Sequence, residues 1–421
     1  MSIFKEIPPT AGFSFSFRDI FSLSKIIKYH NTFENDFKDY LGSSYTNITY
    51  SGTAALYLIL ESLKELSTKK TVIIPSYVCP LVPLAIKRAA LKVEVCDIDK
   101  DSFDFDYKEL DSLCACSNDI LAVVSVHLAG IPINFDNVAR IAKQRGIFII
   151  EDCAQALGAE YLPARPAGRP AGRQGKGKKV GTLGDFSFFS LCRGKGLTIY
   201  EGGVAVANNA RYTKFLEDKI NALEKNDVFS ESFKVLELFG YWLFYNPYLF
   251  WFVFRMPQAF WSLRGRNLKA YAEEYTLDFP MHRVSRLRKI LGQMSFYRLD
   301  KEVASQREKA EYYIRELSNQ QGLRLIKEPD NAKATYPYLV LLFDDIKRRE
   351  KVLKLLVGRG FGASIVYISP ITDYDYLKDI VGHKKCPAAT NISQRQITLS
   401  TNSFLKEKDL AAIIDIIKNT Y

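Results

Sequence analysis

The sequence offers little that could cross a membrane or direct the chain out of the cell. Its aromatic-rich stretch, residues 236–262, contains a charge-free run over residues 238–254 that Asn246-Pro247 interrupts. A membrane-spanning helix needs about twenty consecutive apolar residues, so this run is too short to span. The N-terminal residues MSIFKEIPPTAGFSF have no apolar core before a cleavage site, which predicts no signal peptide.

Cysteine patterns that form disulfides or hold a metal are also missing. The seven cysteines are odd in number and scattered, which indicates free thiols in a reducing, cytoplasmic compartment. Cys114-x-Cys116 has no second pair and no histidine close in sequence, so we expect no metal site. No nucleic-acid motif accompanies the net charge of +11. That charge favours a phosphorylated substrate, an anionic membrane surface or nucleic acid without choosing among them.

The length and composition indicate a globular protein of two domains. The 421 residues are too many for one typical core, and 47% of them are hydrophobic, which is ordinary for a folded protein. We expect a large domain over 1–225, an aromatic-rich insertion over 226–280 and a small domain over 281–421. The pattern of the small domain predicts a helix over 287–317, strands over 335–343 and 363–368, and a helix from Glu407.

In the first half of the chain, apolar β-branched runs alternate with helical patterns. Runs buried on both faces and separated by helices indicate an α/β fold with a mostly parallel sheet. Ligands bind such sheets beyond the carboxyl ends of the strands, where Asp152 stands. An aspartate there either caps the following helix or faces a ligand. The predicted strands lie at 71–75, 92–99, 119–130 and 146–152.

The remaining residues are organised around the stretch Val180–Asn208. Alternating aromatics precede Lys195, which stands between two glycines, and a second alternating run follows a Gly-Gly pair. This order predicts a strand, a tight loop and a second strand. A desolvated lysine amine loses its proton easily and forms a Schiff base with an aldehyde. The alternative is a solvated lysine on a hairpin loop.

Ser51-Gly52-Thr53 opens a predicted helix after a short polar strand. Serine or threonine at a helix start usually caps the free backbone amides. The same amides and the positive end of the helix dipole can instead hold a phosphate. Both roles are open from the residues alone.

The segment GDFSFFSLCRGKGLTIYEGG resembles the lysine segment of pyridoxal-phosphate (PLP) sugar aminotransferases of the DegT/StrS type. Two further segments resemble that family: Ser51-Gly52-Thr53, and the run from Glu151 to Ala156 that contains Asp152 and Gln155. The residues of the lysine segment that match without a gap are Gly184, Asp185, Phe189, Ser190, Lys195, Leu197, Thr198, Glu201, Gly202 and Gly203.

This resemblance implies a fold-type I PLP transferase with a large domain and a smaller C-terminal α/β domain. Lys195 would hold PLP, and Asp152 would keep the pyridine nitrogen protonated. The cofactor-binding set that the resemblance implies is Gly52, Thr53, Asp152, Gln155, Ser190 and Lys195. It also implies a homodimer with a shared active site, an amino donor that is usually glutamate, and a keto group on a nucleotide-linked sugar as acceptor.

Three positions depart from the family pattern. Cys79 stands where the family has an aromatic that stacks on PLP; either Tyr77 substitutes or the stacking is lost. A basic Pro/Gly/Arg insertion occupies 162–175. It is either a solvated loop without a specific role or a loop that contacts an anionic substrate or surface. Met281 replaces an asparagine that contacts the neighbouring subunit's cofactor phosphate, whereas Arg283 is retained and is a candidate to face an acidic substrate group.

The aromatic stretch and its basic flank, residues 236–269, carry no family motif. All three tryptophans lie there, and basic residues follow the charge-free run. One interpretation is a helical hairpin in the membrane interface, which would place a cytoplasmic enzyme peripherally on the membrane. The other is burial at a dimer interface or over the substrate cleft. Rival functions for the whole chain are a PLP-dependent sugar dehydratase and a non-catalytic membrane-associated binding protein.

Overall fold

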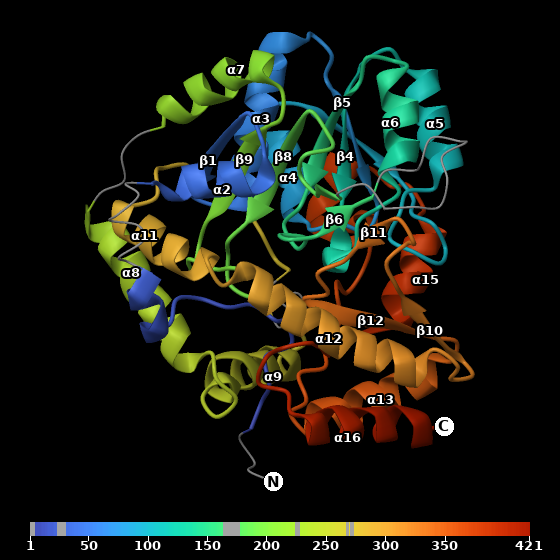
Figure 1. The fold of residues 1–421 in the computed structure, drawn as a ribbon. Coiled ribbons are helices and arrows are strands. Elements are labelled where there is room, and N and C mark those ends of the chain that lie inside the picture. The colour runs from blue at the N-terminus through green and yellow to red at the C-terminus, as the bar shows by residue number, and fades with distance from the viewer. Residues whose placement is uncertain (1–4, 23–30, 163–176, 224–227, 267–268, 270–272) are drawn as a thin grey trace, which may run out of the picture.

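A computed structural model describes residues 5–22, 31–162, 177–223, 228–266, 269 and 273–421 (Figure 1). Its centre is a seven-stranded sheet in which β9 alone runs against the other six strands. This confirms the expected α/β fold with a mostly parallel sheet. The strands, in spatial order, are β1 (Tyr45–Thr49), β9 (Gly203–Ala207), β8 (Phe186–Ser190), β5 (Phe148–Asp152), β4 (Ile120–Val126), β2 (Thr71–Pro75) and β3 (Lys92–Cys96).

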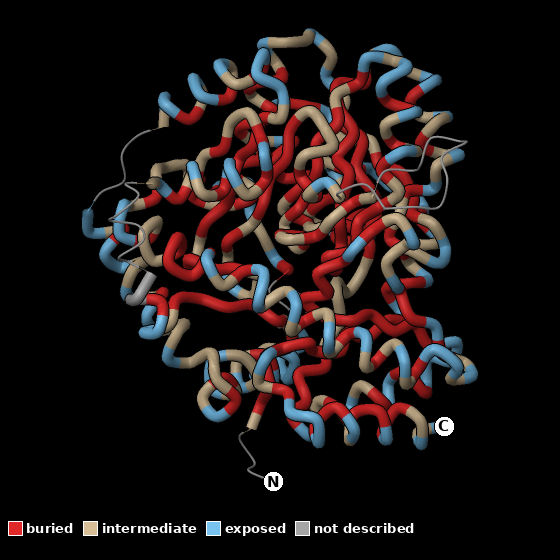
Figure 2. Tube along the Cα trace, in the orientation of Figure 1, coloured by how far each residue is buried: buried red, intermediate tan, exposed pale blue. Residues whose placement is uncertain are grey.

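Both faces of this sheet are buried, which explains the continuous apolar runs (Figure 2). Alternate residues of a strand enter different cores: Val72 and Ile74 join one, and Ile73 joins the other. The first core contains α3 (Gly52–Leu66), α4 (Leu81–Arg88) and α7 (Ala210–Asn221). The second contains α2 (Phe33–Leu41), α5 (Tyr107–Cys116) and α6 (Phe135–Lys143).

The C-terminal part forms a smaller antiparallel sheet in the order β10-β12-β13. Its strands are β10 (Leu323–Ile326), β12 (Tyr338–Phe343) and β13 (Gln396–Ser400). The helices of this part are α12 (Leu299–Leu317), α13 (Ile346–Gly358), α14 (Lys378–Val381), α15 (Pro387–Arg395) and α16 (Glu407–Asn419). Short elements complete the fold: η2 (Leu128–Gly130), η4 (Ile371–Asp373), η5 (Asp375–Leu377), and the sheet of β11 (Ala332–Lys333), β6 (Glu160–Tyr161) and β7 (Lys178–Lys179).

Two expectations for this part were wrong in detail. The helix over 287–317 is two helices, α11 (Arg286–Phe296) and α12, because the chain turns at Arg298, which pairs with Asp19 at 2.6 Å. The segment 363–368 is no strand and makes a single bridge, Ser364 to Thr398. The third strand of the sheet is β13, and the predicted helix from Glu407 is confirmed as α16.

The aromatic insertion (residues 226–280) folds as α8 (Val228–Phe244), a π-helical turn η3 (Trp251–Arg255) and α9 (Met256–Leu263), with the chain reversing at Asn246-Pro247. In Figure 1 these helices lie at the edge of the molecule, away from the α5 and α6 side. None of the described helices has the length and apolar content that crossing a membrane needs.

The N-terminal segment connects the insertion, the small sheet and the large sheet. Glu6 is buried and pairs with Arg255 at 2.8 Å, while Ile7 donates its amide to Gly360. Phe13 forms a bridge with Leu197. The described part of the N-terminal residues 15–41 contains the 3₁₀-helix η1 (Phe17–Ser22) and α2. Apart from Leu162, the basic insertion at 162–175 lies outside the described residues.

Candidate active site

A cavity of about 1110 Å³ lies beyond the carboxyl ends of β2, β4, β5 and β8. Every residue that the sequence assigned to PLP lines this cavity: Gly52, Thr53, Asp152, Gln155, Ser190 and Lys195. We call these residues, with Ser51, the catalytic floor. Segments separated by more than a hundred residues therefore meet at one edge of the sheet, as a parallel α/β fold requires.

Lys195 lies on the loop 191–202 between β8 and β9, which confirms the predicted strand, loop and strand. Gly194 adopts a φ of +72°, a backbone conformation that favours glycine. The N-terminal segment packs on this loop so closely that a Cβ at Gly12 would lie 2.6 Å from the Lys195 carbonyl oxygen. No hydrogen bond or ion pair within the described residues holds the Lys195 amine. The amine is thus free to react while its backbone is fixed.

Asp152 ends β5 with its side chain buried. Burial raises the pKa of this carboxyl to about 6, against the opposing effects of the Ala154 amide and the charges of Lys195 and His127. The amide of Ala154 donates to Asp152 Oδ1 at 3.0 Å, but β5 is followed by a turn and not by a helix, so the expectation that Asp152 caps a helix was wrong. Asp152 also lines the cavity, and its raised pKa shows that burial disfavours the charged carboxylate. A cationic N–H group of a ligand would stabilise that charge.

Helix α3 points its first turn into the cavity. Ser51 caps it by accepting the Ala54 amide at 3.0 Å, which leaves the amides of Gly52 and Thr53 beside Ser190. The first turn carries no acidic side chain. A Cβ at Gly203 would lie 2.3 Å from Ser51, so glycine is needed there for β9 to pass this helix start. Ser51 therefore caps the helix, while the amides of Gly52 and Thr53 in the same turn are available to an anion.

Gln155 is held rigidly. Its Oε1 accepts hydrogen bonds from the Ala129 amide at 2.9 Å and from the Tyr338 hydroxyl at 2.6 Å. Its carboxamide NH₂ is therefore oriented away from these donors, as a group that recognises a ligand oxygen should be.

Cys79 lines the cavity and Tyr77 does not. Tyr77 is buried, stacks on Phe103 at 5.9 Å, and donates its hydroxyl to the Tyr367 carbonyl at 2.8 Å. Substitution of the missing stacking aromatic by Tyr77 is therefore wrong, because its ring is committed to the core. Burial raises the pKa of the Cys79 thiol to about 11, so at neutral pH this position of the cavity lining is uncharged and non-aromatic.

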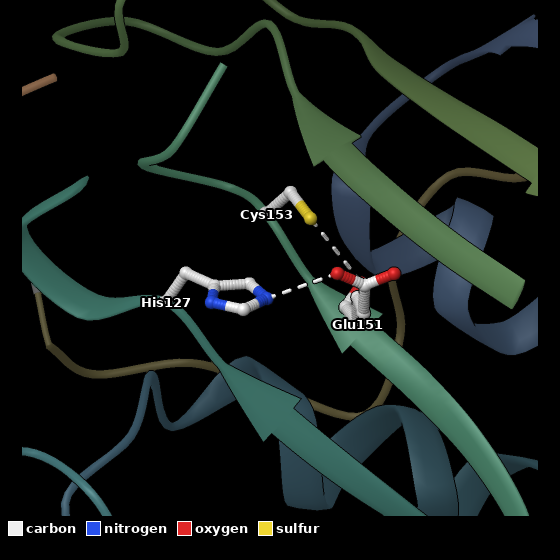
Figure 3. A group of neighbouring side chains, drawn as sticks. All are labelled: His127, Glu151 and Cys153. Atoms are coloured by element: carbon white, nitrogen blue, oxygen red, sulfur yellow. Dashed lines mark hydrogen bonds and ion pairs between the residues drawn. The ribbon is translucent and has the colours of Figure 1, made fainter. Parts of the chain in front are cut away.

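His127, Glu151 and Cys153 form a buried cluster below the floor (Figure 3). The Glu151 carboxylate accepts the amides of Gly181, Leu183 and Gly184 at 2.7–2.9 Å. His127 Nδ1 accepts the Ile133 amide at 3.3 Å, so Nε2 carries the proton and donates to Glu151 at 3.2 Å. Burial raises the pKa of the Cys153 thiol. Since these atoms already have partners or protons, the cluster is a hydrogen-bonded support for the loop at 181–184.

A buried ion pair that the sequence analysis missed joins the insertion to the floor. Arg288 of α11 is fully buried and donates to both oxygens of Glu231 of α8, with Nε to Oε2 at 2.8 Å, and to the Glu201 carbonyl. Burial opposes ionisation, but the hydrogen bonds from Arg288 and Ser285 lower the pKa of Glu231 to about 2. The two partners are 57 positions apart, so no local pattern could have paired them.

Glu273 is a second missed residue of the cavity. It is buried, and accepts hydrogen bonds from the Tyr374 hydroxyl and from the Ile368 amide at 3.3 Å. Burial raises the pKa of Glu273 to about 7, despite the hydrogen bonds from Tyr374 and Ile368. This carboxyl ties the end of the insertion to the small-sheet region beside the site.

The insertion forms the rest of the cavity lining. Its inner face, defined as Phe244, Phe250, Phe254, Pro257 and Trp261, lines the cavity. Its outer face, defined as Phe233, Leu236, Leu243, Phe252, Phe260 and Leu263, is exposed, from 42% for Phe252 to 90% for Leu263. Burial over the cleft thus describes one face of the insertion, while the other face remains apolar and uncovered.

Arg283 and Met281 lie outside the cavity lining of their own chain. Arg283 donates Nη2 to the Asn221 carbonyl at 2.8 Å, and its buried Nε has no partner. Met281 packs partly buried against the core.

The floor fits PLP on structural grounds. A helix start with free amides and a neighbouring hydroxyl suits the phosphate, a buried carboxylate suits the protonated ring nitrogen, and an untethered amine suits the aldehyde.

The seven cysteines are all free thiols, and Cys79 and Cys192 line the cavity.

Comparison with known proteins agrees with this fit. The sequence matches the model of the DegT/DnrJ/EryC1/StrS aminotransferase family over residues 22–232 and 270–418. The UDP-4-amino-4,6-dideoxy-N-acetyl-beta-L-altrosamine transaminase of Campylobacter jejuni is 25% identical over 412 residues, which cover 94% of this chain and 93% of that protein.

Solved structures share the fold. The sugar aminotransferase CalS13 from Micromonospora echinospora matches with a TM-score of 0.73 and 18% identity, covering 99% of this chain and all of that one. The E. coli GDP-4-keto-6-deoxy-D-mannose-3-dehydratase with bound hydrated PLP matches with a TM-score of 0.70 and 16% identity, covering 98% and 100%. Since the family match covers most of the residues and leaves out only the centre of the insertion and the chain ends, the chain belongs to the DegT/DnrJ/EryC1/StrS aminotransferase family.

Proposed function

We propose that this PLP-dependent aminotransferase moves an amino group from glutamate to a keto group on a nucleotide-linked sugar. The observation that carries the proposal is the meeting of Lys195, Asp152 and the open α3 start in one cavity. The relative from Campylobacter jejuni is named a transaminase of a UDP-linked amino sugar. Polysaccharide or glycoconjugate biosynthesis is the corresponding role.

Five residues of the floor have a task in this reaction. The amides of Gly52 and Thr53 and the Ser190 hydroxyl bind the phosphate. The Asp152 carboxylate holds the proton on the pyridine nitrogen, and bound PLP then supplies an electron sink. Lys195 Nζ would hold the cofactor and, once the amino donor has displaced it as a free amine, would take the proton from the donor α-carbon.

The dehydratase alternative is disfavoured by Lys195. Sugar dehydratases that resemble this family generally replace the lysine, whereas here it lies in the cavity with a fixed backbone and a free amine. The non-catalytic alternative is disfavoured by the retained Lys195 and Asp152, because binding alone requires neither the amine nor the buried carboxylate.

We further propose a cytoplasmic homodimer with a shared active site. Arg283, whose buried Nε lacks a partner, would then face an acidic substrate group at the neighbouring subunit's cavity. The domain division at 1–225, 226–280 and 281–421 is supported by the gap in the family match at 233–269. We also propose peripheral contact of residues 236–269 with anionic membranes, supported by the outer face and the cations at Arg264, Arg266 and Lys269.

The test is substitution of Lys195 by alanine. We expect the variant to lose the yellow absorbance of covalently held cofactor and all measurable turnover with glutamate and a panel of keto-sugar nucleotides. The other lysines that line the cavity, Lys234 and Lys269, are paired with carboxylates and so do not offer an unpaired amine. Lys214→Ala, on the exposed side of α7, is the control and should behave as wild type. Unchanged absorbance in the Lys195 variant would overturn the proposal.

A further inference from the structure

We propose that the inner face of the insertion is the subsite for the nucleoside half of the acceptor. The inference rests on the proposed function and deepens it, since it names the residues that recognise the carrier. The family match omits residues 233–269, so this wall belongs to this chain and not to the common family pattern.

The cavity has room for such a subsite. Its volume of about 1110 Å³ is at the upper limit of ordinary ligand pockets, which span about 300–1,000 Å³. The catalytic floor takes up the part where the cofactor and the reacting sugar carbon must meet. Part of the remaining lining is the inner face, which is aromatic and offers flat apolar surface. Polar side chains of the same insertion, among them Lys234, Glu237 and Gln258, also line the cavity.

The cavity lining contains a cation and aromatic rings, which suit two parts of a nucleotide-linked sugar. Arg193 lines the cavity two residues before Lys195, and its guanidinium lies 5.2 Å from the Tyr200 ring. The next loop residue, Gly194, donates its amide to the Tyr241 hydroxyl of α8 at 3.4 Å. A cation therefore stands where the Lys195 loop meets the insertion. Arginine is suited to a diphosphate, and aromatic rings beyond it are suited to stack on a base.

The inner face is held in place before any ligand arrives. Phe250 and Phe254 stack at 4.9 Å, and Tyr241 and Tyr245 stack at 4.6 Å. The Tyr245 hydroxyl donates to the Thr10 carbonyl at 2.6 Å. Because these rings are already ordered, a base would lose little additional side-chain entropy on binding.

The experiment measures binding of UDP, GDP and dTDP to the cofactor-loaded protein by calorimetry, with inorganic diphosphate and a polyprenyl diphosphate in detergent as comparison probes. We expect at least one nucleoside diphosphate to bind more tightly than inorganic diphosphate. Phe254→Ala and Trp261→Ala should each weaken that binding by about tenfold, the loss typical of one stacked base. The matched outer-face variants, Phe233→Ala and Phe252→Ala, should leave it unchanged.

The spectral change on adding glutamate without acceptor provides the second readout. It should be unaltered in both inner-face variants, which shows that they fold and that the floor is intact. Equal nucleotide binding by wild type and inner-face variants would overturn the inference, as would binding of the polyprenyl diphosphate alone. Failure of the glutamate response in wild type would instead contradict the proposed function, because nucleotide binding does not depend on turnover.

Discussion

The catalytic floor and the aromatic insertion are two parts of one cavity with different relations to the sequence. Each floor residue stands at a helix start, at a strand end or in the loop that follows a strand, so its place follows from the local motif and the parallel sheet. The insertion is apolar on both sides, so its composition does not say which side covers the cavity. Sequence motifs located the groups assigned to the reaction. Only tertiary contacts distinguished the inner from the outer face of the insertion.

The largest effect is expected at the ion pair that joins the two regions. Glu231→Ala leaves Arg288 charged, buried and without its carboxylate, so we expect a loss of about 3–5 kcal/mol in the free energy of unfolding, measured by denaturant titration. Asp375→Ala removes an exposed pair with Lys378, which solvent screens, so its free energy of unfolding should stay close to that of wild type. A Glu231 variant as stable as the Asp375 variant would show that the insertion does not depend on Arg288.

The next prediction concerns the floor alone. Asp152→Asn keeps an oxygen that can accept the Ala154 amide but loses the charge that holds the pyridinium proton. We expect cofactor binding to persist and turnover to fall about 10²- to 10³-fold. Absorbance and steady-state rates measure the two quantities, with the exposed Asp218→Asn as control. Near-normal turnover would mean that Asp152 only holds the turn at Ala154.

Glu273 provides a pH test of the junction between the insertion and the small sheet. Its pKa is raised to about 7 from 4.5, so the unfolded carboxyl ionises first and stability falls as pH rises from about 4.5 to 7. Glu273→Gln should reduce the change in the free energy of unfolding across this pH range by up to about 3 kcal/mol. Thermal unfolding of wild type, Glu273→Gln and the exposed neighbour variant Glu274→Gln across that range gives the comparison. A Glu273 variant with the wild-type slope would contradict the assignment.

The smallest effect is expected at the outer face. Wild type should float with anionic liposomes at low salt and less at high salt, because apolar area and basic residues act together. Replacing Leu236, Leu243 and Leu263 by serine should reduce flotation several-fold with little loss of stability, since these side chains are 50–90% exposed.

The control for flotation replaces Leu287 and Leu355, which are exposed on other helices. Its flotation should equal that of wild type. If wild type never floats and the outer-face variant becomes monomeric, the outer face is an interface between subunits and the membrane proposal is wrong.

The sequence alone determined the fold class, the strand order along the chain and which residues meet in the floor. The apolar run at 71–75 coincides with β2, and the run at 146–152 begins two residues before β5 and ends with it. The runs mark the strands because a strand buried on both faces must be apolar throughout. Lys195, Asp152 and Ser51-Gly52-Thr53 were identifiable because each motif combines a reacting or anion-binding group with its own backbone geometry.

Only the tertiary structure decided the remaining features. The partners of Arg288, the raised pKa of Glu273 and the burial of Tyr77 depend on contacts between segments far apart in the sequence. The segment 363–368 has a β-like composition but forms one bridge, because β13 takes the place beside β12. Short-range patterns carry propensity and chemistry, but burial and pairing are properties of the packed chain.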